Sequence, residues 1–586
     1  MTAMRYTAAC LTDGPKPTGE DWGDRIAGLA DDYADLKLVV LPQLPETTQV
    51  GVSGLAAVAR DYDVHIAGAI GAEPYLLSPA GKNLLADAAD SYPVVRSDIG
   101  DLAVVVGDDV RIHEVVRGHT LGGAEIMLNP ARERPDALAG ARELARSGRA
   151  YENLVALLTA SAGGTSGAWD SHGAMLVSGG AKTDAIATKI DLETLRTSRT
   201  VPMLNFPAQL RTKLYAVEYD RAAARAKDWA TEPTPPIAPY QVLIAQAHIT
   251  TVPSVEQADE VISANLDRSL GLAGKFAMQP GIKLVVFPEY WMTGAAFGKS
   301  VDDFWPNVGI RMDGPHFARL QEFASKVGSY VGGAIFEYDP DWPRRWFNTA
   351  FIINPSGDVI LKYRKLQCGD INGLLNNTTP GNVYSEYVQR YGEDGIFPVV
   401  DTDIGRLGAC ICYDTNFPEL WRSLTLRGAE LIVYPTGEPH NGHRTAWDVA
   451  KRAHAAENQI YIASANAGCE AVTPDAPTTF FHRGYSKLIG PDGRAVAVAD
   501  TGGEVPLVAK VDIEALRRAR RDADLSIIDK VDFETAAAMY RSHDGFPMDW
   551  ALEKPTETAD EGIKIVLETM ARYRETGVYR APSKAA

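Results

Sequence analysis

Short apolar runs recur along the chain and alternate with stretches of helical length. The runs at 284–287 and 407–412 are rich in Val, Ile and Leu, and each has the length of a strand buried in a sheet. Towards the C-terminus, apolar residues between 563 and 570 fall at i, i+3, i+4 and i+7, which predicts an amphipathic helix that stops by Gly577. The pattern predicts an α/β protein with a helical C-terminal extension.

The first part of the chain is repeated in the second. Three segments match three others at a constant offset of 305 residues: 98–109 with 403–414, 122–131 with 427–436, and 152–163 with 457–468. Two further matches lie upstream, 36–48 with 282–294 and 77–85 with 353–361. The repeat predicts two homologous domains at 1–228 and 241–525, a Pro-rich linker at 229–240 and a helical extension at 526–586.

Three positions differ in chemistry between the two copies. The pairs are Cys412 with Gly107, Glu289 with Gln43, and Lys365 with Ala89. The first copy also lacks most of the loop between the lysine and the cysteine. Because a thiol, a carboxylate and an amine are missing together, we interpret them as one catalytic set. The domain at 1–228 is therefore predicted to be degenerate and inactive.

Cysteine, glutamate and lysine together suit attack on a carbonyl-like carbon. The thiolate is the nucleophile, the carboxylate moves its proton to the leaving group, and the ammonium stabilises the tetrahedral intermediate with the backbone N–H of Tyr413. Cys412 ends an apolar strand and precedes a helix, whose positive end favours the thiolate. Glu289 and Lys365 also follow strand-like runs, and ligands gather at strand ends in α/β sheets.

Composition narrows the class of protein. An apolar content of 45% and a charged content of 23% are those of an ordinary globular chain. The net charge of −18 argues against nucleic acid or an anionic membrane as partner. With no long apolar run and no basic, apolar leader, we expect a cytoplasmic location. The five cysteines form no CxxC pair and have no neighbours that complete a metal site, so neither a disulfide framework nor a metal is expected.

Three blocks of the second domain resemble, in the same order, the signature blocks of the nitrilase superfamily of carbon–nitrogen hydrolases. They read VVFPEYWMTG, KYRKLQ and LGACICYDTNFPELWRSLTLRGAELIVYPT. The resemblance implies an α-β-β-α sandwich, nucleophile Cys412, base Glu289 and oxyanion-stabilising Lys365, a thioester intermediate, and no metal or cofactor. Because members of the superfamily commonly dimerise, two such domains in one chain are expected to form an intrachain pseudo-dimer, with further homo-oligomers possible.

Details of the second domain resemble the amidase branches more than true nitrilases. Tyr413 and Asp414 stand where nitrilases usually have Trp-Glu, and the loop at 369–382 resembles the β-ureidopropionase or carbamoylase type. The family's second glutamate, between lysine and cysteine, has no counterpart at 373–379. Glu386 is the first candidate to replace it from a displaced position.

Further residues are candidates for the substrate pocket. Glu438 and His440 lie in the loop at 436–448, where Glu438 could recognise a polar or cationic group; the alternative is an ordinary surface loop. Tyr290, Trp291 and Phe417 flank the signature blocks and could wall the pocket, and plain packing is the alternative for these aromatic rings.

The expected reaction is hydrolysis of a small-molecule amide to a carboxylic acid and ammonia. Carbamoyl-amide or nitrile hydrolysis on the same triad is an alternative. A non-catalytic binding or regulatory protein is the alternative from another class, given the missing second glutamate. The expected partner is a small molecule with an amide-like group.

Overall fold

The computed structural model describes residues 4–12, 22–46, 52–134, 136–180, 183–225, 235–295, 298–368, 377–438, 446–471, 484–522, 524–558 and 560–583. The chain divides into two compact units. The first unit comprises Met1–Ala216, Lys530–Gly545 and Val566–Ala586, and the second comprises Val217–Asp529 and Phe546–Ile565. Among the described helices, none is long and apolar enough to cross a membrane.

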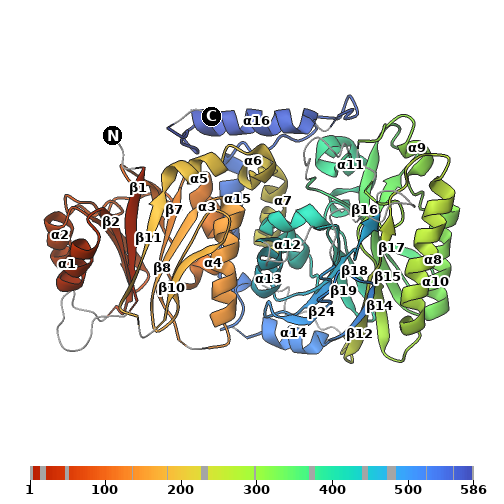
Figure 1. Ribbon diagram of the computed structural model, residues 1–586, viewed down its shortest axis with the longest axis horizontal. Coiled ribbons are helices and arrows are strands. Elements are labelled where there is room, and N and C mark those ends of the chain that lie inside the picture. The colour runs from red at the N-terminus through yellow and green to blue at the C-terminus, as the bar shows by residue number, and fades with distance from the viewer. Residues whose placement is uncertain are drawn as a thin grey trace. The chain divides into compact units, whose positions relative to one another are not determined.

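The first unit is built on two sheets, of five and six strands in the described residues (Figure 1). The five-stranded sheet is β11 (Ala185–Asp191), β1 (Arg5–Leu11), β2 (Leu36–Leu44), β3 (His65–Ile70) and β4 (Glu73–Leu77). The six-stranded sheet is β10 (Met175–Gly179), β9 (Ser166–Trp169), β8 (Ala156–Ala162), β7 (Ile126–Arg132), β6 (Gly100–Val104) and β5 (Val95–Ser97). The helices are α1 (Trp22–Asp32), α2 (Val52–Asp61), α3 (His113–Leu121), α4 (Ala139–Asn153), α5 (Leu192–Ser198) and α6 (Phe206–Gln209).

The second unit has two six-stranded sheets. One is β17 (Val359–Arg364), β16 (Trp346–Ile353), β15 (Tyr330–Tyr338), β14 (Ile282–Val286), β12 (Tyr240–Gln246) and β25 (Val505–Val511). The other is β18 (Val399–Thr402), β19 (Gly405–Ala409), β20 (Leu431–Thr436), β21 (Tyr461–Asn466), β23 (Lys487–Ile489) and β24 (Ala495–Val498). Its helices are α8 (Ala258–Ala277), α9 (Trp305–Val308), α10 (Pro315–Val327), α11 (Tyr384–Tyr391), α12 (Pro418–Leu426), α13 (Ala446–Asn458) and α14 (Ile513–Arg520), and β13 (Ile249–Thr250) pairs with β22 (Glu470–Ala471).

The layers of the second unit follow from its apolar patterns. The central strands β14, β15, β20 and β21 are almost wholly buried, because each sheet is covered on both faces. The sheets pack on each other through β15 with β20 and β12 with β21, helices α8 and α10 cover one outer face, and α13 covers the other with α12 beside it (Figure 1). Gly332 lets the sheets approach closely, since an added Cβ would lie 2.9 Å from Val433. The predicted α-β-β-α sandwich is confirmed.

The two units share one strand order. In each, a parallel core is flanked by antiparallel edge strands, and β5–β10 run in the same order and directions as β18–β24. The clearest difference is β17, an extra strand of the second unit that leads directly into Lys365. The exact domain boundaries and the pseudo-dimer stay predictions.

The C-terminal extension is helical, as predicted. It contains α15 (Phe533–Ser542) and α16 (Asp560–Glu575), and α16 ends before Gly577. The remaining helix, α7 (Thr212–Arg225), precedes the predicted linker, part of which lies outside the described residues.

Candidate active site

Cys412 occupies a sharp turn between a strand and a helix. Strand β19 ends at Ala409, a short 3-10 turn spans Cys412–Asn416, and α12 begins at Pro418. Cys412 is 9% exposed and has a left-handed φ of 47°, a conformation that costs a non-glycine residue about 1–3 kcal/mol. Gly107, its counterpart in the first unit, has a φ of 55°. The turn therefore exists with or without a thiol.

Glu289 and Lys365 form a buried ion pair. Glu289 follows the end of β14, Lys365 follows β17, and they are 2% and 3% exposed. The Lys365 Nζ donates to Glu289 Oε1 over 2.8 Å, and Asn348 Nδ2 donates to the same oxygen over 2.6 Å. Glu289 Oε2 is buried and has no hydrogen-bond partner among the described residues. This oxygen is thus left available to take a proton from the thiol.

Burial outweighs the helix end that was expected to favour the thiolate form of Cys412. Burial and the neighbouring Glu289 carboxylate raise the pKa of Cys412 to about 12, although the Lys365 ammonium and the Gly437 N–H act in the opposite direction. The first turn of α12 lies several residues further on, so its positive end acts on the sulfur less than burial does. Attack by this sulfur would require a base beside it to take the thiol proton.

Lys365 is a cation at neutral pH. Burial alone would lower the pKa of Lys365, but Cys412, Glu289, Cys368 and Asp414 together hold it above its usual range. A fixed ammonium in a buried site stabilises developing negative charge more strongly than the same ammonium in water. The three predicted triad residues are therefore brought together.

Asp414 connects the turn of Cys412 to the segment of Lys365, a role that the comparison of motifs missed. Its Oδ2 accepts from the Tyr363 hydroxyl (2.7 Å) and the Ile411 N–H (2.9 Å), and its Oδ1 accepts from the Gln367 N–H (3.0 Å). The carboxylate thereby joins the turn that carries Cys412 to the segment that carries Lys365.

Asp414 also gives a testable pH dependence. Burial raises its pKa to about 6, so the folded protein binds this proton more tightly than the unfolded chain. The stability that the proton contributes is complete below about pH 4 and is lost as the pH rises through about 6. Asparagine does not titrate, so the free energy of unfolding of D414N, minus that of the unchanged protein, should rise by about 1–3 kcal/mol across this window. Urea denaturation at several pH values measures it, and a flat difference would contradict the burial of this charge.

Two more residues hold the turn and the base. Tyr434, in β20, donates its hydroxyl to the Cys412 carbonyl oxygen over 2.5 Å. Asn129, its counterpart in the first unit, likewise donates to Gly107 over 3.0 Å. Asn348 was not among the residues predicted from the sequence. The match of 77–85 with 353–361 places Ala72 opposite it, so comparison of the two copies could have identified this residue. The oxyanion role of the Tyr413 N–H stays a prediction.

The other predicted pocket residues are placed differently. Tyr290 is 6% exposed with a left-handed φ of 38° and stacks on Phe336. Burial together with the charges of Glu289, Glu470 and Cys412 raises its pKa. Trp291 is fully buried and stacks on Phe287 at 5.1 Å, so its role is packing. Phe417 is also fully buried and precedes α12.

The structure does not bring Glu386 to the triad. Its carboxylate forms an ion pair with Arg390, one turn along α11 at a partly exposed position. No interaction of Glu386 with the triad occurs among the described residues, since a charge on a helix surface is satisfied locally. His440 lies outside the described residues, as do 373–376 of the segment 373–379, where the family's second glutamate has no counterpart. Glu438 is buried at the end of β20, next to Gly437.

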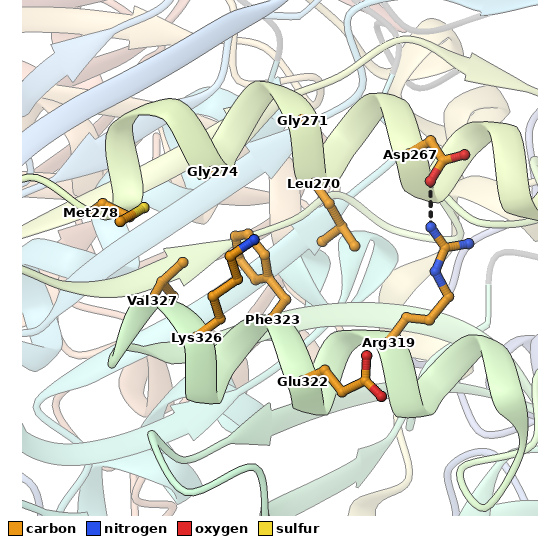
Figure 2. Close-up of a pocket in the computed structure, with 10 residues that line it drawn as sticks. All are labelled: Asp267, Leu270, Gly271, Gly274, Met278, Arg319, Glu322, Phe323, Lys326 and Val327. Atoms are coloured by element: carbon orange, nitrogen blue, oxygen red, sulfur yellow. Dashed lines mark hydrogen bonds and ion pairs between the residues drawn. The ribbon is translucent and has the colours of Figure 1, made fainter.

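A groove of about 420 Å³ lies elsewhere, between α8 and α10. Figure 2 shows Leu270 and Phe323 between the two helices and the ion pair of Asp267 with Arg319 at one side. None of the triad residues lines this groove. Within the described residues, no group of three or more His, Cys, Asp or Glu side chains could hold a metal ion.

Comparisons with known proteins give the family of the chain. The carbon–nitrogen hydrolase family profile matches residues 244–521. The omega-amidase NIT2-A of Xenopus laevis is 30% identical over 267 residues, which cover 44% of this chain and 87% of that protein. Human omega-amidase NIT2 is 28% identical over 272 residues, covering 45% and 89%. Both matches cover about as much of the chain as the second unit's sandwich.

Solved structures are similar to this chain over about half its length. An amidase from Nesterenkonia sp. has 22% sequence identity and a TM-score of 0.35, covering 48% of this chain and 93% of that one. Nit3 of Saccharomyces cerevisiae, a member of branch 10 of the nitrilase superfamily, has 24% identity and a TM-score of 0.37, covering 49% and 95%.

Proposed function

Because the chain belongs to the carbon–nitrogen hydrolase family of the nitrilase superfamily, and is thus a hydrolase of non-peptide carbon–nitrogen bonds, we propose that it converts a small-molecule carboxamide to a carboxylic acid and ammonia through a thioester on Cys412. The observation that carries the proposal is the buried contact of Glu289 with Lys365 beside a thiol in a left-handed turn. The names of the omega-amidases and of the Nesterenkonia amidase favour amides over nitriles.

Formation of the thioester needs one proton to travel from sulfur to nitrogen. As Cys412 Sγ bonds to the carbonyl carbon, Glu289 takes the thiol proton and the carbonyl oxygen becomes an oxyanion. The Lys365 ammonium and the Tyr413 N–H stabilise that charge. When the carbonyl re-forms, the carbon–nitrogen bond breaks, the nitrogen takes the proton from Glu289, and ammonia leaves.

Hydrolysis of the thioester repeats these roles with water. Glu289 removes a proton from water as its oxygen attacks the thioester carbon, and the same oxyanion site is used again. Collapse of this second intermediate breaks the carbon–sulfur bond, and the proton on Glu289 returns to Cys412 Sγ. The carboxylic acid leaves, and the thiol and carboxylate are regenerated.

The first unit is proposed to be catalytically silent. An added Cβ on Gly107 would lie 3.0 Å from Gln43 Oε1, so these two residues keep the contact that Cys412 and Glu289 make in the second unit. Gln43 Nε2 donates to the Gly71 carbonyl over 2.7 Å, and its neutral amide cannot act as a base at this position. Ala89, the residue opposite Lys365, is exposed.

Ammonia release from a panel of carboxamides, carbamoyl amines and nitriles tests the reaction, with mass spectrometry of the protein after substrate addition. We expect release from at least one carboxamide and an acyl adduct on Cys412. Turnover of carbamoyl amines or nitriles alone would replace the amide assignment. No release and no adduct with any panel member would favour a binding protein.

A further inference from the structure

Glu438 lies one residue beyond the backbone N–H that contacts the thiol. Strand β20 ends at Thr436, the Gly437 N–H faces Cys412 Sγ, and Glu438 follows. The side chain is buried, at 8% residue exposure, and its backbone oxygen is held by Asn466 Nδ2 at 2.9 Å. Its Oε1 forms an ion pair with the buried Lys451 of α13. Its Oε2 is buried and has no hydrogen-bond partner within the described part of the chain.

The first unit shows which part of this arrangement occurs without the triad. Its counterpart of Glu438 and Lys451 is the buried ion pair of Glu133 with Arg146. That pair survives in a unit without the triad, so the pair itself belongs to the fold. Glu133 leaves no oxygen buried without a partner among the described residues. Glu133 Oε2 likewise makes no hydrogen bond among the described residues but is not fully enclosed, so the second unit differs in burying its free oxygen. A buried acceptor left unpaired costs about 1–3 kcal/mol.

A neighbouring buried ion pair has no counterpart among the described residues of the first unit. Lys487, in β23, pairs with Asp448 of α13. By strand register its counterpart is Gly167, whose added Cβ would meet the ring of Trp169 at 2.7 Å. Asp448 corresponds to Glu143, which is exposed. The fold thus forms without this pair, although burying two charges costs several kcal/mol.

The charges around Glu438 decide which ligand group suits its free oxygen. The cluster has no net formal charge, because it holds two carboxylates, Glu438 and Asp448, and two ammonium groups, Lys451 and Lys487. Burial and the charge of Lys451 lower the pKa of Lys487 to about 8, so the cluster resists additional positive charge. An anion is excluded because the unpaired atom is itself a carboxylate oxygen. A neutral N–H donor satisfies the oxygen without changing the charge balance.

We propose that Glu438 Oε2 binds an N–H of the scissile carboxamide and so makes the site selective for primary amides over the corresponding esters. The inference rests on the proposed amide hydrolysis. Because the Gly437 N–H contacts the Cys412 thiol, Glu438 is the next residue along the chain after that contact. Tyr434 supports this placement: its hydroxyl contacts the Cys412 carbonyl oxygen, and the charges of both Glu438 and Cys412 act on that hydroxyl.

The substitution Glu438→Gln tests the hydrogen bond. Lys451 would attract the glutamine oxygen, so the glutamine NH₂ would face the substrate and present a donor where an acceptor is needed. We expect kcat/KM for the most active primary amide of the panel to fall by about 10–100-fold. The methyl ester of the same acid has an acceptor oxygen there, so its kcat/KM should stay level or rise. An unchanged ratio of amide to ester turnover would overturn the proposal.

The matched control is Glu133→Gln, the same chemical change at the counterpart position, which should leave the ratio unchanged. If Glu438→Gln does not fold, as judged by thermal unfolding, Glu438→Asp keeps the charge and withdraws the oxygens by one methylene. It should lower amide turnover more than ester turnover, and an equal loss of both would again overturn the proposal. If the unchanged protein hydrolyses neither substrate, the proposed function fails instead of the hydrogen bond.

Discussion

Replacing Cys412 with alanine is expected to lower kcat for the best amide by at least about 10⁴-fold without unfolding the protein. No other described thiol lies in the left-handed turn beside Glu289 and Lys365. The fold should survive because Gly107 holds the same turn without a side chain. Ammonia release measures the loss, and thermal unfolding checks the fold.

The matched control is Cys410→Val, two residues earlier on the same strand. Cys410 is fully buried, and Val105 occupies the counterpart position, so valine fits this environment. Burial raises the pKa of Cys410 well above its usual value, so it is no nucleophile. Activity should stay within a few-fold of the unchanged protein. Turnover that survived in C412A and disappeared in C410V would reverse the assignment of the nucleophile.

Glu289→Gln is expected to lower kcat by about 10²–10⁴-fold, the range that general acid–base catalysis contributes. Glutamine keeps the size of the side chain, and its oxygen can still accept from Lys365 and Asn348 in place of Oε1. Its NH₂ then occupies the place of Oε2 and cannot accept the thiol proton. Burial, the first cause of the raised pKa of this thiol, persists in the variant, so little thiolate forms at neutral pH without the base. Single-turnover mass spectrometry should show the acyl adduct on Cys412 forming more slowly by the same factor.

The reverse exchange in the first unit, Gln43→Glu, serves as the comparison. It introduces a carboxylate beside Gly107, where there is no thiol to activate, so ammonia release should not change. Adduct formation at the normal rate in E289Q would show that another group removes the proton from Cys412.

Much of the catalytic core could be predicted because the chain contains its own reference. The apolar runs at 284–287 and 407–412 predicted one strand in each sheet of the second unit, β14 and β19, and the repeat singled out Cys412, Glu289 and Lys365. The same comparison could have found Asn348, which stands opposite Ala72, because a residue that positions the base is lost with the base. The spacing of the matched segments was thus enough to identify these residues and to place them at the ends of strands.

The electrostatics of the site could not be predicted from spacing. The state of the Cys412 thiol depends on burial, and the burial of one side chain is decided by segments more than a hundred residues away. Asp414 reads as part of a motif, yet its contacts reach Tyr363 and Gln367 on another segment. Glu386 failed as a replacement glutamate because helix α11 gives it a nearby arginine instead. Such contacts follow from tertiary packing, which single-residue patterns do not encode.

The left-handed turn that the two units share has a consequence for which substitutions it accepts. At position 412 a side chain occupies a conformation that suits glycine, so the proposed nucleophile carries a cost of about 1–3 kcal/mol in the folded state. Glycine at position 107 makes the same turn without that cost. Exchange of the side chain for glycine therefore relaxes the backbone, whereas the opposite exchange strains it and needs stabilisation from other contacts.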